Sequence, residues 1–129
     1  MTTVLKVIND ELNRIGVPYE FMEWTDPVQY PYFVGEYQEA PPTAEDGGKE
    51  ATLLLTGTTN SQFGGSWLEL EQFRSAIEDL FHPVCGLRIS VEDGAVAIFY
   101  ENSFPVPTGE ADLKRIQINL TIKKWKGMN

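Results

Sequence analysis

The sequence has very little of the residue types from which enzymes and metalloproteins build their sites. Its 129 residues include one cysteine, Cys85, and one histidine, His82. One cysteine excludes an intrachain disulfide, and one cysteine with one histidine cannot form a Cys/His metal site. This pair is also the only Cys/His candidate for nucleophilic catalysis, and nothing in the sequence orients the histidine. We expect Cys85 to be a small buried hydrophobic residue, and His82 to be a helix C-terminal cation or a neutral packed ring.

Other signals are absent as well. No apolar run approaches the roughly 18 residues of a membrane span, and residues 1–16 carry charges where a signal peptide has an apolar block. The glycine-containing segment 57–65 lacks the Lys-Ser/Thr ending of a phosphate-binding loop. The paired carboxylates are sequence neighbours, which point apart on a helix and are solvated at turns. The sequence predicts no cofactor, no metal and no catalytic residue, and it favours an intracellular protein that is not an enzyme.

Acidic residues are missing from the end of the chain. Residues 1–112 contain all 19 acidic and five basic residues, a net charge of −14. Residues 113–129 contain five basic residues and no acid, a net charge of +5, which gives −9 for the whole chain. An acidic body argues against a sequence-specific nucleic-acid binder. The asymmetry suits head-to-tail packing of a basic edge on an acidic face, and lysines that merely protect a sheet edge are an equally good explanation.

What the chain does contain is the pattern of one domain over residues 1–129. Apolar residues at three- and four-residue steps predict a helix over 3–15, which Gly16 and Pro18 end. Strands are expected over 19–24 and 30–39, in a stretch dense in aromatic residues. These aromatic residues either cover a core beneath a small sheet or form a docking surface: Tyr19, Phe21, Trp24, Tyr30, Tyr32, Phe33 and Tyr37.

The middle of the chain alternates between turn-forming loops and apolar elements. Residues 40–49 and 57–65 read as loops on either side of a central strand over 51–56. A capping box formed by Ser66 and Glu69 opens a second helix, and His82-Pro83 ends it. Strands over 87–91 and 95–100 follow, joined by an Asp-Gly turn, and the proline-containing segment 101–112 reads as a loop or irregular edge.

The last strand, Leu113 to Trp125, has the clearest pattern. Ile116, Ile118, Leu120 and Ile122 alternate with polar or charged residues, so one face meets a core and the other meets water or a partner. The expected fold class is therefore α+β, with two amphipathic helices packed on one face of a twisted, mainly antiparallel sheet.

In its order of elements the whole chain resembles the tail terminator (tail completion, head-tail joining) proteins of long-tailed bacteriophages. The resemblance rests on the end of the first helix at Ile15-Gly16-Val17-Pro18, the entry Tyr30-Pro31-Tyr32-Phe33-Val34, the strand 51–56, the helix capped by Ser66 and the basic last strand. It implies a structural protein that forms a ring, usually a hexamer, at the head-proximal end of the tail tube. There it stops tube polymerisation and contacts the head connector, while DNA passes through the lumen.

The resemblance gives expectations for partners, location and surface. The partners would be further copies of the chain, the tail tube protein and the head connector protein, without a membrane. The chain would reside in the virion tail, and in the host cytoplasm during assembly. The expected protein-interface residues are Arg115, Lys123, Lys124, Trp125, Lys126, Trp24, Tyr30, Tyr32, Tyr37, Glu45 and Asp46. The alternatives are a non-enzymatic adaptor or regulatory module of a bacterial or prophage system, and an enzyme that uses Cys85 or carboxylates brought together by the fold.

Overall fold

The protein is a curved six-stranded sheet carrying two helices. The computed structural model describes residues 2–22, 29–39, 49–91 and 94–126, without the side chains of residues 2, 49, 50 and 126. The elements in chain order are α1 (Thr2–Arg14), β1 (Tyr19–Phe21), β2 (Tyr32–Glu39), β3 (Lys49–Asn60), the 3-10 helix η1 (Ser61–Phe63), α2 (Trp67–Leu80), β4 (Leu87–Val91), β5 (Gly94–Val106) and β6 (Leu113–Lys126).

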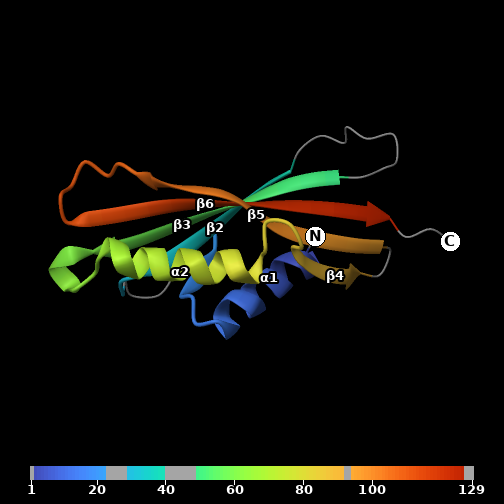
Figure 1. Cartoon of the computed structure of the whole chain (residues 1–129), viewed down its shortest axis with the longest axis horizontal. Helices are drawn as coiled ribbons and strands as arrows, with labels where there is room; N and C mark the ends of the chain where they lie inside the picture. Colours follow the sequence, from blue (N-terminus) through green and yellow to red (C-terminus); the bar gives the residue numbers. More distant parts are fainter. Residues whose placement is uncertain (1, 23–28, 40–48, 92–93, 127–129) are drawn as a thin grey trace.

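The strands lie in the order β1-β2-β3-β6-β5-β4, so β3 and β6 form the centre of the sheet. β1 pairs with β2 in parallel, and every other neighbouring pair is antiparallel. Both helices lie on the same side of the sheet (Figure 1). The β5–β6 hairpin and η1 are at one end of the molecule, and β4 is at the other. Among the described residues, no helix is both long and apolar enough to cross a membrane.

The predicted fold class is wrong. The chain is mostly sheet: half of the described residues are in strands and 28% are in helices, and the six strands form a half-barrel. The error has a physical origin in β3 and β5, which have 12 and 13 residues and were each predicted about half as long. Long strands accumulate the right-handed twist of the backbone, and this coils the sheet.

β3 continues through Gly57 because this glycine packs beneath an aromatic ring. A Cβ at Gly57 would overlap the ring of Phe33, which is fully buried on the neighbouring strand. A glycine in a strand commonly marks such a close approach, which sequence alone does not distinguish from a loop. The predicted loop over 57–65 is therefore strand as far as Asn60, followed by η1.

β5 continues past Tyr100 because its second half lies at the sheet edge. β4 pairs only with residues 94–98, so Pro105 needs no N–H for a ladder on its outer side. A register shift between Tyr100 and Asn102 makes a bulge, in which Glu101 is the extra residue. The segment predicted as a loop or irregular edge is thus a strand as far as Val106.

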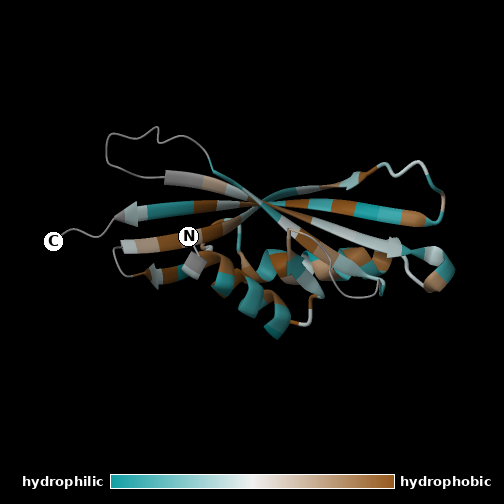
Figure 2. Cartoon of the chain, turned by 180° about the vertical axis from the view of Figure 1, so that it is seen from behind, coloured by the Kyte–Doolittle hydropathy of each residue, from teal (hydrophilic) through white to brown (hydrophobic). Residues whose placement is uncertain are grey.

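The core lies between the inner face of the sheet and the two helices. The four apolar residues of β6 predicted to face a core are buried, as are Val4, Ile8 and Leu12 of α1 and Leu70 and Ile77 of α2. Each fully buried side chain of this size contributes about 1.5–3 kcal/mol relative to exposure. Figure 2 shows hydrophilic and hydrophobic residues alternating along the long strands.

The helix ends show how local sequence sets the boundaries. Gly16 follows α1 with a φ of 86°, which confirms the predicted left-handed cap. Ser66 caps α2, because its Oγ accepts a hydrogen bond from the Glu69 amide at 3.3 Å. The other half of the predicted capping box is wrong: the Glu69 carboxylate instead accepts from the buried Thr59 hydroxyl at 3.0 Å.

Candidate assembly surface

The face of the sheet opposite the helices is uncovered by any described helix (Figure 1). In β6 this open face carries the residues that alternate with the buried ones, and they bond to one another. Gln117 donates to Asn119 at 3.0 Å, and Asn119 donates to Asn102 of β5 at 2.7 Å. These amides therefore satisfy one another by hydrogen bonds along the surface.

The open face also contains apolar side chains between these polar rows. The registers place Val34 of β2, Leu54 of β3, and Phe99 and Phe104 of β5 in line with polar residues of β3 or β6. Val34, Leu54 and Phe99 are half-buried, and Phe104 is 45% exposed. The surface is amphiphilic, because apolar side chains lie between polar and charged ones, and aromatic residues such as Phe99 and Phe104 are frequent where a surface contacts another molecule.

Two predicted basic residues lie on this open face, near opposite ends of β6. Arg115 is half-buried, and its Nε donates to Thr58 at 3.2 Å. Lys123 is exposed, and its Nζ lies 5.8 Å from the centre of the Phe99 ring, within cation–π range. Eight residues of extended strand separate them by about 26 Å.

The interface residues predicted at the end of the chain belong to the last strand. β6 extends to Lys126, and Lys123, Lys124 and Trp125 alternate between its two faces. Trp125 is 44% exposed on the same face as Lys123, whereas Lys124 lies on the opposite face and is half-buried. The pleat of the strand therefore divides the predicted interface residues Lys123, Lys124 and Trp125 between its two faces. Trp24, Glu45, Asp46 and the Lys126 side chain lie outside the described part of the chain.

The aromatic residues of the predicted docking surface also fall into two groups, one partly exposed and one packed against the core. Tyr30 stacks on Phe63 of η1 with ring centres 5.6 Å apart, and it lies 5.8 Å from the Tyr32 ring. Tyr37 is half-buried against the core, and burial raises its pKa to about 12. Phe33 lies within the core, edge-on to Phe73 at 5.6 Å. Tyr30 and Tyr32 therefore belong to a half-buried ring cluster with the exposed Phe63, and Tyr37 and Phe33 have packing roles.

Sequence reasoning missed an apolar cluster beside η1 and the start of α2. Phe63, Trp67 and Leu68 are 72%, 47% and 66% exposed, respectively. Trp67 also lines a hollow of about 380 Å³ against the β5–β6 hairpin, together with Val106 and Leu113. The only available signal was that Trp67 and Leu68 fall off the apolar stripe of α2, so large apolar side chains had to face outward.

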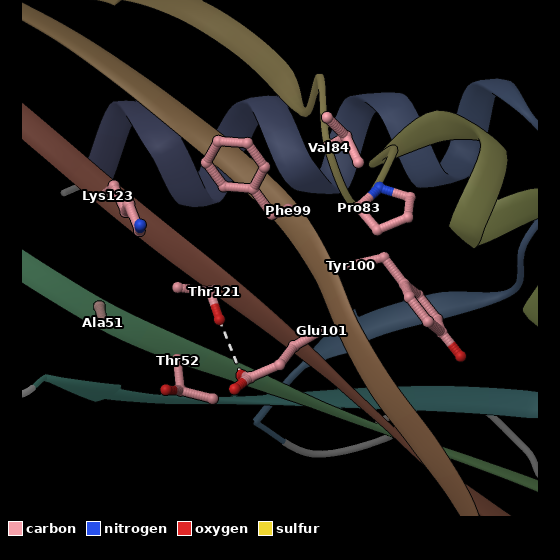
Figure 3. Close-up of a pocket in the computed structure, with 9 residues that line it drawn as sticks. All are labelled: Ala51, Thr52, Pro83, Val84, Phe99, Tyr100, Glu101, Thr121 and Lys123. Carbon is pink, nitrogen blue, oxygen red and sulfur yellow. Dashed lines mark hydrogen bonds between the residues drawn. The ribbon is translucent and has the colours of Figure 1, made fainter.

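A larger hollow of about 750 Å³ opens beside the β5 bulge (Figure 3). It contains one ammonium group, from Lys123, and one carboxylate, from Glu101, which accepts from the Thr121 hydroxyl at 2.7 Å. Phe99, Pro83 and Val84 supply apolar walls. Among the residues that line it, a second carboxylate for paired acid–base chemistry is absent.

The turn beside this hollow corrects the prediction for Cys85. Cys85 is exposed, because residues 82–86 form a tight turn along the edge of β5. His82 Nδ1 accepts hydrogen bonds from the amides of Val84 and Cys85, each at 3.1 Å. This places His82 as the acceptor that shapes the turn. Within the described ranges, no three His, Cys, Asp or Glu side chains gather into a possible metal site.

Comparison with known proteins finds no matching family model and no matching curated protein. Five solved chains resemble the structure. One superposes with a TM-score of 0.65 at 16% sequence identity, over 88% of this chain and 82% of the other. That protein has only a serial designation, which names no activity or partner. At such low identity the likeness shows a shared fold alone, and folds of this size host unrelated functions.

Proposed function

We propose that this protein is a non-enzymatic structural subunit that assembles into a ring at the head-proximal end of a long phage tail. The observation that carries the proposal is the open face of the sheet, which runs the length of β6 and is amphiphilic. A sheet usually buries its apolar residues against a second layer. In a ring, neighbouring subunits would pair with the edges of the sheet, partner proteins at the two ends would cover apolar parts of the open face, and its polar rows would face a lumen.

The charge distribution supports the same proposal. DNA binding strengthens with each cation that neutralises a phosphate. The open face contains many Thr, Asn and Gln side chains, and its basic residues Arg115 and Lys123 contact Thr58 and the Phe99 ring. Its third described basic residue, Arg88, is accompanied on the same face by the carboxylates of Glu36 and Glu101. A lumen lined in this way would hold DNA weakly and let it pass. The tail tube protein and the head connector would then contact the two ends of the ring.

The proposal is tested by native mass spectrometry and sedimentation velocity over a range of concentration and salt. A concentration-dependent ring, hexameric by the resemblance, and binding to a tail tube or connector protein are expected. Charge reversal at the exposed Lys123 should weaken assembly, with Lys6→Glu on exposed α1 as the matched control. A strict monomer that binds neither partner would refute the ring, and a monomer that binds one regulatory protein would favour an adaptor.

A further inference from the structure

The two outer strands of the sheet leave backbone groups without a strand partner in the described structure. β1 pairs only with residues 33–35 of β2, so residues 36–39 have no described strand on their outer side. β4 has β5 on one side and no described strand on the other. Unpaired sheet edges are templates for pairing with another chain.

The hydrogen bonds around β1 show which groups of β2 point outward. The Phe33 amide donates to the Pro18 carbonyl at 2.7 Å, and the Gly35 carbonyl accepts from the Met22 amide at 2.8 Å. Odd-numbered residues of β2 therefore direct their N–H and C=O groups away from β3. By the same alternation, the backbone groups of Tyr37 and Glu39 point outward beyond the end of β1.

The same reasoning applies to β4. The Tyr100 amide donates to the Phe81 carbonyl at 2.6 Å, on the side of β5 away from β6. Ile98, two residues earlier, therefore faces β4, where it pairs with Leu87. The backbone groups of Arg88, next along β4, then point outward, as do those of Ser90. The outer edge of β4 contains no proline, whereas the free part of the β5 edge has both a bulge and Pro105.

The two edges are complementary in direction and in side chains. Counting through the antiparallel pairs shows that β2 and β4 run in the same direction. Rotation about an axis along the strands keeps that direction, so neighbours in a ring would pair β4 with β2 in parallel. On the open face, β2 presents the exposed Glu36 and β4 presents the exposed Arg88, and neither forms a salt bridge with another described residue.

Steric fit selects a register. In a parallel ladder, a residue whose backbone N–H and C=O groups point toward the partner strand lies opposite a residue whose groups point away from it. Arg88 would therefore lie opposite either Glu36 or Gln38. The first register would place Leu87 beside Gly35, a position that Phe21 of β1 already occupies. The second places Arg88 beside Gln38, with Glu36 two residues away, and sets Leu87 beside Tyr37. Both of these apolar residues are half-buried against the core side of the sheet.

We propose that the outer edge of β4 in one copy pairs in parallel with residues 36–39 of β2 in a second copy, with Arg88 opposite Gln38 and within reach of Glu36. This inference rests on the proposed function and names the contact that would build the ring. The contact is heterologous, because each copy donates one edge and accepts at the other, so it closes into a ring or extends into a filament.

Disulfide trapping tests the contact directly. The exposed Cys85 is first replaced by serine, and Gln38→Cys and Arg88→Cys are then made in separate preparations. Neighbouring strands lie about 4.8 Å apart, within disulfide range. Mixing and oxidation should give a one-to-one cross-linked pair, and a chain with both substitutions should give a ladder. Ser75→Cys on the exposed side of α2, mixed with Arg88→Cys, is the control for random collision.

A charge exchange tests the contact without new cysteines. Arg88→Glu should weaken self-association at least several-fold in sedimentation, because it sets two carboxylates side by side, and mixing with Glu36→Arg should restore it. Assembly that persists in Arg88→Glu and gives no specific cross-link would overturn the edge contact while leaving the ring intact. Cross-linking of Arg88→Cys with itself would also overturn it, in favour of a two-fold β4–β4 contact. Absence of self-association at every concentration would remove the proposed function as well.

Discussion

The contacts of Arg74 allow the effect of removing its side chain on stability to be worked out. Its guanidinium, with the side chain 19% exposed, bonds to Glu71 at 2.5 and 2.8 Å and to Glu78 at 2.7 Å. It also donates to the Tyr100 hydroxyl at 3.2 Å, which in turn donates to Ser103 at 2.6 Å. Arg74 thereby connects α2 to β5 beside the bulge, so Arg74→Ala removes a link between helix and sheet.

The expected loss can be worked out from these contacts. Glu71 and Glu78 are 53% and 37% exposed, so solvent screening limits each helical ion pair to about 0.3–0.5 kcal/mol. The bond to Tyr100 adds a net contribution of about 1 kcal/mol, and the partly buried stem adds a few tenths more. Arg74→Ala should therefore lower the free energy of unfolding by about 2 kcal/mol.

Arg14 offers a matched control. It pairs with Glu11 at the same three-residue spacing and a distance of 2.7 Å, but its side chain is 62% exposed and contacts no strand. Arg14→Ala should lower stability by no more than about 0.5 kcal/mol. Urea unfolding followed by circular dichroism, at one fixed protein concentration, measures both variants. Equal losses for the two would show that the Tyr100 link contributes nothing.

Three further predictions concern acid, a buried hydroxyl and a glycine. Hydrogen bonds from Arg74 hold the pKa of Glu71 below its ordinary value of 4.5, so this stabilisation is complete above the ordinary value and is lost as pH falls through the lower one. Arg74→Ala should thus lose less stability than the parent between about pH 5 and pH 3 in urea titrations. Burial raises the pKa of Tyr19 to about 12, and its hydroxyl has no hydrogen-bond partner in the described structure. Tyr19→Phe should therefore leave stability unchanged or raise it by up to about 1 kcal/mol. A clear loss of stability in thermal unfolding would reveal a partner for the hydroxyl. Gly57→Ala should lower stability by about 1–3 kcal/mol because its methyl group meets the Phe33 ring, and Phe33→Leu in the same chain should recover part of that loss; no recovery would place the strain elsewhere.

Much of the local structure could be predicted from sequence because the signals are short-range. Periodicity gave α1 and the last strand to within a residue, and Ser66 marked the start of α2. The errors arose where a tertiary contact decides whether a residue lies in a strand or in a loop. Gly57 reads as a loop residue until the Phe33 ring is placed above it, and Pro105 reads as a strand breaker until its strand proves to be at an edge.

The candidate surface was harder to predict, because exposure depends on which side of an element meets the core. A strand pattern cannot tell which of two faces helices will cover, and the parallel pairing of β1 with β2 has no local signature. Cys85 was misplaced for a similar reason: its apolar neighbours suggested burial, but the turn shaped by His82 lies outside the sheet edge. Phe63, Trp67 and Leu68 were overlooked because a loop and a helix start were expected to be polar.

The strict alternation of β6 has a consequence for how the gene can vary. Successive side chains of this strand belong to two different layers, so deleting or inserting one residue within it would reverse the faces of every residue on one side of the change. A deletion near Leu120, for example, would turn Lys123 toward the core and Ile122 away from it. Because the strand pairs along nearly its whole length on both sides, the shifted residues would be mispaired with β3 and β5 wherever the change falls. Length changes should therefore be tolerated in the exposed turn between β5 and β6 and rejected inside β6. A library of single-codon deletions, scored for soluble protein, would show this strand as an interval without survivors.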